Sequence, residues 1–183
     1  MLTFLIRTHA RPQQYARALA SVPKQCKTLT HTQTVQDLNY VSIGLHHCST
    51  IADTSQPYFY NTFCNTLLQY LDEGHGIFLD DDDIVIPGSV EQLKLEDGKS
   101  YLIPFMRGQY EVPHLWGRKG YVTRGLIGMP CLILWYEHKN FVKFEATEDA
   151  DYRAIRSLQE QIELEWLHVP VVYSERRNFG KTE

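Results

Sequence analysis

The first half of the chain alternates short strand-like apolar runs with helix-like stretches. The run LTFLI, residues 2–6, predicts a buried strand, and residues 12–22 carry apolar side chains at helical spacing. The pattern continues with strands in 27–35 and 40–45, a helix in 58–74 and a strand in 76–79. Such alternation is typical of a mostly parallel sheet covered by helices on both faces.

The second half has longer apolar runs and fewer helices. Strands are expected in residues 101–106, 130–136 and 168–173. A helix is expected in residues 147–166, with Thr147 as its N-cap and acidic residues in its first turn. No repeat, low-complexity stretch or linker divides the chain. The pattern predicts one α/β domain with a mixed, mostly parallel central sheet flanked by helices.

Composition and charge restrict the classes of protein. The 183 residues are 43% apolar, as in ordinary soluble globular domains. A formal net charge of −4 argues against a protein that mainly grips bare nucleic acid, although nucleic acid is not excluded as an acceptor. Four cysteines without paired spacing predict free thiols in a reducing compartment. The lack of a signal-like start and of an apolar stretch of about 20 residues predicts a cytoplasmic protein without a membrane span.

An acidic run interrupts the apolar pattern at GIFLDDDDIVIP, residues 76–87. Four adjacent carboxylates repel one another, so this run is costly unless something positive neutralises it. Apolar residues on both sides hold the run against the core at the end of a strand, where open α/β sheets bind ligands. Mg²⁺ or Mn²⁺, held by one or two carboxylates and by substrate phosphates, would neutralise the run. The alternative is a solvated surface loop.

Four segments, in this order, resemble a family 2-type glycosyltransferase with the GT-A (Rossmann-like) fold. They are FLIRTHARPQQYARALASV, the helix that carries Asn65, FLDDDDIVIP and TEDADYRAIRSL. The helix and the acidic segment also resemble those of small viral glycosyltransferases, which would place the protein in a host cytoplasm. The resemblance implies a single domain, residues 1–183, with a nucleotide-sugar-binding half at about 1–90 and an acceptor-binding half at about 100–183.

The resemblance implies roles on the donor side. Thr8 and Arg11 match the family's nucleoside-binding loop, whereas Arg7 stands where the family has Pro. Asn65 matches a helix asparagine that lines the donor site, although Cys64 replaces the usual Arg before it. A merely polar helix face is the alternative for Asn65.

The acidic segment matches the family's metal-binding Asp-x-Asp pattern. Asp80 and Asp82 take its outer positions, and Asp82 is the expected main ligand of Mn²⁺ or Mg²⁺. Asp80 and Asp81 are expected near the ribose, the diphosphate or metal-bound water. The implied activity is a metal-dependent, hexosyltransferase-like transfer of sugar from a nucleotide-diphosphate sugar.

The resemblance implies fewer residue roles on the acceptor side. Asp149 matches the family's general base, and one carboxylate base with in-line attack gives inversion at the anomeric carbon. For Glu148 and Asp151, we expect only that acids suit the start of a helix. The acceptor is a hydroxyl group of a glycan, a glycoprotein or another molecule, and Trp116 either stacks on a sugar or packs in the core.

The basic residues near the C-terminus complete the predicted site. Arg176, Arg177 and Lys181 either close over the diphosphate or form a solvated tail. Two other functions stay open at this point. A nucleotidyltransferase normally opens with a Gly-rich phosphate loop, which RTHARPQQY lacks. A non-catalytic domain that binds a sugar nucleotide or a glycan would need Asp82 but not Asp149.

Overall fold

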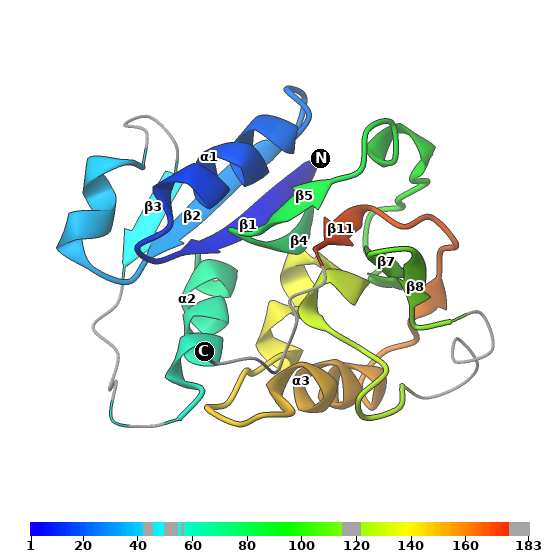
Figure 1. Cartoon of the computed structure of the whole chain (residues 1–183). Helices are drawn as coiled ribbons and strands as arrows, with labels where there is room; N and C mark the ends of the chain where they lie inside the picture. Colours follow the sequence, from blue (N-terminus) through cyan, green and yellow to red (C-terminus); the bar gives the residue numbers. More distant parts are fainter. Residues whose placement is uncertain (42–45, 50–54, 56, 115–121, 176–183) are drawn as a thin grey trace.

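The computed structural model describes residues 1–41, 46–49, 55, 57–114 and 122–175. A seven-stranded sheet in the order β10-β6-β9-β4-β1-β2-β3 forms its centre (Figure 1). In chain order its strands are β1 (Leu2–Thr8), β2 (Lys27–Thr32), β3 (His46–Ser49), β4 (His75–Asp80), β6 (Tyr101–Leu102), β9 (Leu132–Trp135) and β10 (Glu165–Trp166). Strand β9 runs antiparallel to its neighbours β4 and β6, and the other pairs are parallel. The prediction of a mixed, mostly parallel sheet is confirmed.

The middle of the sheet brings two charged positions together. Strand β1 lies between β2 and β4, and Arg7 is in register with His31 on β2 and with Asp80 on β4. Because these three strands are parallel, their carboxyl ends meet at one edge of the sheet. The acidic run therefore begins beside the loop that follows β1.

A second, four-stranded sheet has the order β5-β11-β7-β8. Its strands are β5 (Asp83–Val85), β7 (Phe105–Arg107), β8 (Tyr110–Val112) and β11 (Val172–Ser174). Ser174 is in register with Asp83, so β11 ends against the acidic run. The strand predicted in residues 101–106 is divided between β6 of the central sheet and β7 of this one, and the strand predicted in residues 168–173 overlaps β11. We did not predict β5 and β8, because three residues are too few to show a period.

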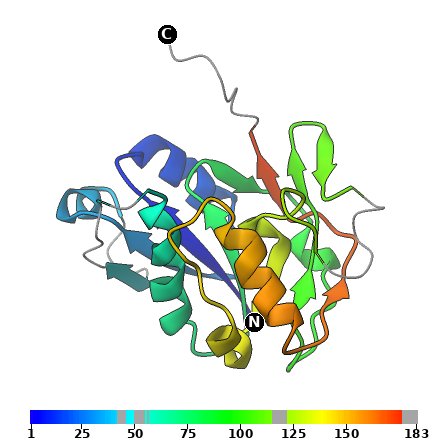
Figure 2. The same cartoon turned by 90° about the horizontal axis from the view of Figure 1, so that it is seen from below.

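The helices cover the two faces of the central sheet. Helix α1 (Pro12–Ser21) lies on one face, and α2 (Phe63–Gln69) and α3 (Ala150–Gln159) lie on the other, as Figure 1 and the view from below in Figure 2 show. Alternate side chains of β1 supply the two cores: Leu5 packs with α2 and α3, whereas Phe4 and Ile6 pack with α1 and the second sheet. This alternation is what a strand buried on both faces requires.

Short 3₁₀ helices fill several connections of the fold. They are η1 (Val35–Asn39), η2 (Phe59–Thr62), η3 (Val90–Gln92), η5 (Met129–Cys131) and η6 (Tyr136–Phe141). The helix predicted in residues 58–74 therefore opens with η2 and is α-helical only from Phe63 to Gln69. The strand predicted in residues 40–45 is found later, at His46–Ser49, while residues 42–45 lie outside the described part of the chain.

The helix predicted in residues 147–166 is shorter than expected. It ends at Gln159, and Trp166 pairs with Leu102 in strand β10 instead of continuing the helical face. Sheet pairing thus overrides a periodic pattern that also fits a helix. Thr147 is not the N-cap: Asp149 occupies that position, and the hydroxyl oxygen of Thr147 is buried without a hydrogen-bond partner.

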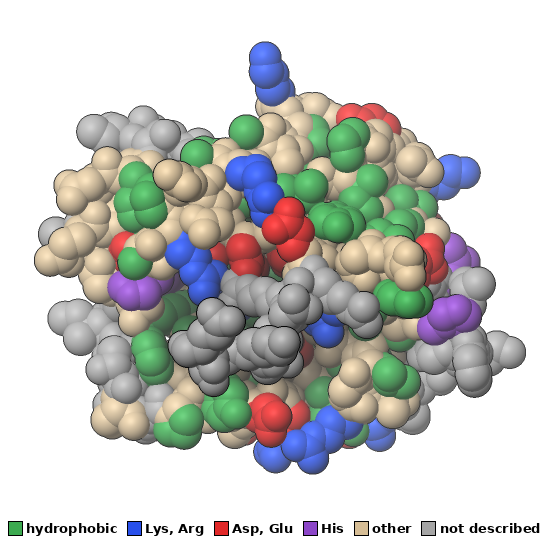
Figure 3. Space-filling model, viewed as in Figure 1, with side chains coloured by type: hydrophobic (Ala, Val, Ile, Leu, Met, Phe, Trp, Pro, Cys, Tyr) green, Lys and Arg blue, Asp and Glu red, His purple; other side chains and the backbone are tan. Residues whose placement is uncertain are grey.

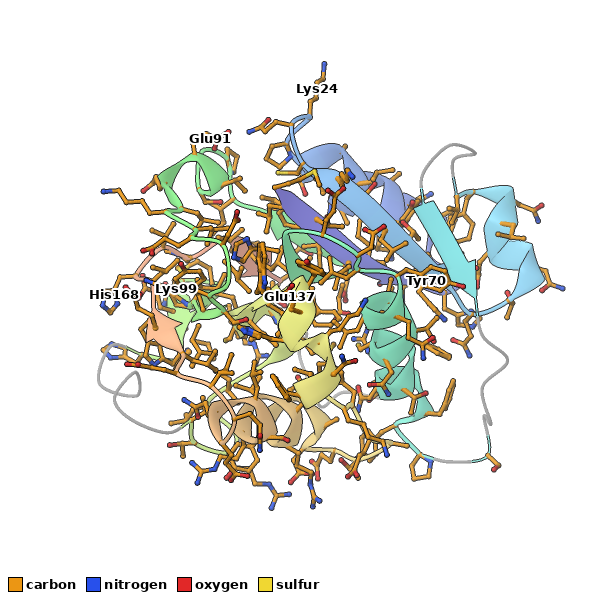
Figure 4. The ribbon with its side chains drawn as sticks, turned by 180° about the vertical axis from the view of Figure 1, so that it is seen from behind. Lys24, Tyr70, Glu91, Lys99, Glu137 and His168 are labelled. Carbon is orange, nitrogen blue, oxygen red and sulfur yellow. The ribbon has the colours of Figure 1, made fainter. Side chains whose placement is uncertain are left out.

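The rear of the molecule carries scattered charge. In the view from behind in Figure 4, Lys24, Glu91, Lys99 and Glu137 come from different segments and lie apart from one another. Within the described ranges, no helix is both long and apolar enough to cross a membrane. The concentration of charge lies instead at the carboxyl ends of β1 and β4.

Candidate active site

A cavity of about 510 Å³ opens beside the carboxyl ends of β1 and β4. One wall is polar and consists of Arg7, Thr8, His9, Arg11 and Gln33 with the acidic residues 80–82. The aromatic part of the lining comes from η2 and the start of α2. Its members are Phe59, Tyr60 and Phe63. Such a mixture of apolar surface and convergent polar groups is typical of a small-molecule site.

Arg7 is the partner of the first carboxylate. Its Nη2 and Nε atoms donate to Oδ1 of Asp80 over 2.5 and 3.0 Å, and its Nη1 donates to the carbonyl oxygen of Tyr60 over 3.2 Å. Burial alone would lower the pKa of Arg7, but Asp80 outweighs it and raises that pKa above the usual value. Arg7 is therefore a permanent cation in the lining of the cavity. The comparison of the sequence with the glycosyltransferase family had shown only that Arg7 replaces the family's Pro.

Arg11 is the partner of the next two carboxylates. Its Nη1 lies 3.1 Å from Oδ1 of Asp81 and 3.6 Å from Oδ2 of Asp82. The backbone N–H of His9 also donates to Asp81, over 3.4 Å. In the space-filling view of this face, carboxylate and Lys/Arg side chains meet near the centre (Figure 3). The acidic run is thus neutralised in part by arginines from β1 and from the loop that follows it.

Asp83 differs from the other three acids. Its side chain is buried and hydrogen-bonds to Ser174 of β11. Burial and the nearby charge of Asp80 raise the pKa of Asp83 to about 7. Asp83 therefore joins the strand β11 to the acidic run, and it does not line the cavity.

Asp82 and Asp80 are the residues that would hold a divalent cation together with a bound phosphate. Among the described residues, no group of three or more His, Cys, Asp or Glu side chains is arranged to hold a metal ion by itself. Mg²⁺, however, is usually held by one or two carboxylates plus substrate phosphates. Asp82 lines the cavity, and both bonds from Arg7 fall on Oδ1 of Asp80, which leaves Oδ2 outside that ion pair. These residues fit a cation that is held jointly with a diphosphate.

Asn65 lies away from the lining of the cavity. Its Nδ2 donates to the carbonyl oxygen of Phe144 over 2.7 Å, and its Oδ1 accepts from the N–H of Phe144 over 2.8 Å. One turn earlier, Nδ2 of Asn61 donates to the carbonyl oxygen of Thr147 over 2.9 Å. The two asparagines thus fasten η2 and α2 to the segment that leads into α3.

The replacement Asn65→Ala is expected to lower the free energy of unfolding by about 1–3 kcal/mol, because both backbone groups of the buried Phe144 lose their partner. Urea unfolding followed by tryptophan fluorescence measures the loss. Gln69→Ala, on the exposed end of the same helix, serves as the control and should change stability by less than about 0.5 kcal/mol. Equal effects of the two changes would contradict this role of Asn65.

Asp149 is held by two arginines. Nε of Arg153 donates to its Oδ1 over 2.9 Å, and Nε of Arg124 lies 3.3 Å from its Oδ2. Burial favours a higher pKa for Asp149, but Arg153 and Arg124 outweigh it and lower the pKa below the usual value. Both carboxylate oxygens are therefore occupied, and the group binds a proton weakly.

Asp151, two residues later, has a different environment. Its Oδ2 accepts a hydrogen bond from the N–H of Met129 over 3.1 Å, and its charge acts on Arg7 and Tyr60, which line the cavity. Burial raises the pKa of Asp151 to about 6; Arg7 opposes this increase and Asp80 adds to it. The structure thus brings Asp151, rather than Asp149, into the electrostatic neighbourhood of Arg7 and Asp80. From the sequence we expected Asp151 to be only a helix-start acid, because Arg7, on whose charge it acts, is distant along the chain.

Other predicted residues are distributed as follows. Thr8, Arg11, Asp80, Asp81 and Asp82 all line the cavity. The predicted residues that lie outside the described part of the chain are Trp116, Arg176, Arg177 and Lys181. The cavity is also lined by His9 and Gln33, which we did not predict as site residues. His9 lies in the loop that resembles the family's nucleoside-binding loop, whereas Gln33 was predicted only as part of a strand.

Comparison with protein-family models finds no match for this chain. Among curated proteins, phospholipase D gamma 2 and phospholipase D gamma 3 of Arabidopsis thaliana are each 33% identical to it over 88 residues. The match covers 47% of this chain and 10% of each phospholipase. The chain therefore spans only a small part of each of these curated relatives, and their names describe the full-length proteins.

Solved structures with a similar fold cover nearly the whole chain. S. aureus TarS 1–349 has a TM-score of 0.70 at 14% identity, over 95% of this chain and 60% of that one. The complex of the same TarS fragment with UDP-GlcNAc has a TM-score of 0.69 at 14% identity, over 98% and 59%. The apo-form glycosyltransferase GlyE of Streptococcus pneumoniae TIGR4 has a TM-score of 0.59 at 11% identity, over 96% and 54%. The chain spans less than two thirds of each of these proteins, and at such identities the likeness confirms the predicted fold alone.

Proposed function

We propose that this chain is a glycosyltransferase that moves a sugar from a nucleotide-diphosphate sugar to an acceptor hydroxyl group. The observation that carries the proposal is the cavity in which Arg7 and Arg11 meet the carboxylates of residues 80–82 at the carboxyl ends of β1 and β4. The structural similarity to TarS, which was solved with UDP-GlcNAc, supports the same class of donor here. We take a UDP-sugar as the first donor to test.

On the donor side, the predicted residues that line the cavity have distinct tasks. Thr8 contacts the nucleoside, and Arg11 turns from the acidic run toward the diphosphate, because guanidinium groups suit phosphate. Asp82 and Asp80 hold Mn²⁺ or Mg²⁺ together with the diphosphate, and Asp81 lies beside the ribose. When bound, the metal acts as a Lewis acid that stabilises the charge developing on the leaving diphosphate.

On the acceptor side, a carboxylate at the start of α3 removes the proton of the attacking hydroxyl group. The resemblance implies Asp149 for this role, with inversion at the anomeric carbon. Neither carboxylate is among the residues that line the cavity. We assign the role to Asp151, because both oxygens of Asp149 are paired with arginines and the charge of Asp151 acts on Arg7, which lines the cavity. A general base needs an oxygen that can accept a proton within reach of the substrate.

The chain organisation follows from these assignments. Residues 1–90 form the donor half and residues 100–183 the acceptor half of a single domain.

Arg176 and Arg177 follow directly after Glu175, whose Oε1 accepts a hydrogen bond from Nη1 of Arg17 over 2.9 Å. Arg17 also donates to the carbonyl oxygen of Asp82 over 3.2 Å, so the described chain ends beside the acidic run. A phosphate-binding role for Arg176 and Arg177 is therefore part of the proposal.

Release of free nucleotide diphosphate tests the proposed function. The protein is incubated with Mn²⁺ and a panel of UDP-, GDP- and dTDP-sugars, and the products are separated by anion-exchange chromatography. We expect UDP or another nucleotide diphosphate to be released slowly by transfer to water. Binding of a sugar nucleotide without any release, in the presence of candidate acceptors, would favour the non-catalytic alternative. No binding and no release with any donor would overturn the proposal.

A further inference from the structure

Arg7 forms an ion pair with a carboxylate to which the proposed function assigns a divalent cation. Its Nε and Nη2 atoms both donate to Oδ1 of Asp80, over 3.0 and 2.5 Å, and its Nη1 donates to the carbonyl oxygen of Tyr60 over 3.2 Å. The guanidinium carbon also lies 5.8 Å from the centre of the Tyr60 ring. The glycosyltransferase family that the sequence resembles has Pro at this position, so the resemblance does not imply this ion pair.

The fold holds Arg7 in place beside Asp80. Arg7 belongs to β1 and is in register with Asp80 on β4, so the pairing of the two strands sets them opposite each other. The side chain of Arg7 is only 15% exposed. If the guanidinium group left Asp80 and Tyr60, it would lose three hydrogen bonds in a place that water reaches poorly. The positive charge of Arg7 therefore stays beside Asp80 whatever ligand the cavity binds.

Arg11 holds the next two carboxylates with a side chain that is free to turn. Its Nη1 lies 3.1 Å from Oδ1 of Asp81 and 3.6 Å from Oδ2 of Asp82, but the side chain is 41% exposed. The backbone of the same loop is fixed from inside the fold, because the buried carboxylate of Asp37 accepts the N–H of Ala10 over 2.9 Å. Arg11 can therefore change its partner by rotation of the side chain alone, while the loop keeps its shape.

The carboxylates and guanidinium groups that line the cavity nearly cancel one another. Three carboxylates, of residues 80–82, stand against the two guanidinium groups of Arg7 and Arg11. A divalent cation that approached Asp80 alone would meet the positive charge of Arg7 on the same carboxylate. Repulsion between such charges a few ångströms apart lowers the affinity about tenfold or more even in water. A diphosphate supplies further negative charge and oxygen ligands, which is the usual way in which Mg²⁺ is held.

We infer that Arg7 is a positioning residue that, together with Arg11, prevents the acidic run from binding a divalent cation by itself, so that the cation binds only with the diphosphate of the donor. When the diphosphate binds, Arg11 turns toward it and releases Asp82, whereas Arg7 stays and orients Asp80. Both bonds from Arg7 fall on Oδ1 of Asp80, so Oδ2 remains for the cation. The inference rests on the proposed function, because it takes Asp80 and Asp82 as the carboxylates that hold the cation.

Titration of the protein with Mn²⁺ alone tests the inference, and electron paramagnetic resonance measures the Mn²⁺ that stays free. Arg7→Met removes the charge, so we expect this variant to bind Mn²⁺ at least about tenfold more tightly than the unmodified chain does. Arg7→Lys keeps the charge and should stay within about threefold of the unmodified chain. Lys24→Met removes a positive charge at an exposed position beyond the other end of α1 (Figure 4). It is the control for net charge and should also stay within about threefold.

A gain in affinity is a result that loss of structure does not produce. If Arg7→Met binds Mn²⁺ no more tightly than the unmodified chain, or if Arg7→Lys gains as much as Arg7→Met, the inference is overturned while the proposed function stands. Should Arg7→Met not fold, Arg11→Met decides in its place. It removes the exposed partner of Asp81 and Asp82 and should show the same direction of change.

Binding of UDP-sugars to the unmodified chain, with Mn²⁺ and with EDTA, separates this inference from the proposed function. Tighter binding with Mn²⁺ is expected. Equal binding in the two buffers would overturn the inference, because linkage would then make Mn²⁺ bind equally well with and without the donor. If no donor binds in either buffer, the proposed function fails and the inference fails with it.

Discussion

Asp151→Asn is expected to lower the rate of sugar transfer by about 10²–10⁴-fold while the affinity for the donor changes by only a few fold. The amide cannot take the proton of the acceptor hydroxyl group, but it keeps the shape of the side chain and can still accept the N–H of Met129. Burial disfavours the charged form of Asp151, so a neutral amide should not destabilise the fold. Single-turnover kinetics measure the rate of transfer, and a parallel binding titration measures the affinity for the donor.

Asp149→Asn is the matched comparison, two residues earlier on the same turn. We expect it to reduce transfer far less, because Arg153 and Arg124 already occupy the oxygens of Asp149. The reverse pattern, in which Asp149→Asn abolishes transfer and Asp151→Asn does not, would assign the base to Asp149, as the resemblance to the glycosyltransferase family implies. Full activity of both variants would remove the start of α3 from the chemistry.

The pH dependence of kcat/KM distinguishes the same two carboxylates. A base must be deprotonated, so the rate follows its ionised fraction: constant above its pKa and falling about tenfold per pH unit below it. With Asp151, whose pKa is raised to about 6, the decline should begin near pH 6. With Asp149, whose pKa is lowered, the rate should stay constant through pH 5.

Asp82→Ala is expected to weaken the metal-dependent binding of the donor by about 10–100-fold. The estimate corresponds to the loss of one charge-assisted contact, worth about 1.5–3 kcal/mol. Asp82 lines the cavity, where Nη1 of Arg11 lies 3.6 Å from its Oδ2. Titration of a UDP-sugar in Mn²⁺ measures the effect. Asp72→Ala, at an exposed acid before the other end of β4, is the control, and equal donor affinity in Asp82→Ala and in the unmodified chain would move the metal elsewhere.

Apolar periodicity was sufficient to predict the centre of the fold. The runs at residues 2–6 and 76–79 became β1 and β4, and the acidic residues that follow β4 lie at the sheet edge where they were expected. The grouping of β7 and β11 with β5 and β8 into a second sheet could not be predicted, because it is decided by strand partners and not by a pattern. The overlong helix at residues 147–166 has a similar cause, since the pairing of Trp166 with Leu102 is visible only in three dimensions.

The acids that line the cavity were among the predicted residues, whereas their ion pairs with Arg7 and Arg11 were not predicted. Arg7 was visible only as a substitution, and its role depends on the register that sets it opposite Asp80. Asp37 had a local signal, because Thr34 and Asp37 have the spacing of a capping box, but its bonds to His9 and Ala10 come from a distant loop. Residue type and local spacing thus identify the groups that carry charge, whereas tertiary contacts decide which of them are neutralised, buried or exposed to the cavity.

The central claim is that the acidic end of β4 and the arginines of the β1 edge together bind the diphosphate of an activated sugar. Titration calorimetry of the unmodified chain with UDP-GlcNAc and other nucleotide sugars, in Mn²⁺ and again in EDTA, tests it most directly. The account predicts saturable binding of at least one of these donors, at least about tenfold tighter with the metal. Failure of every donor to bind in either buffer would contradict it.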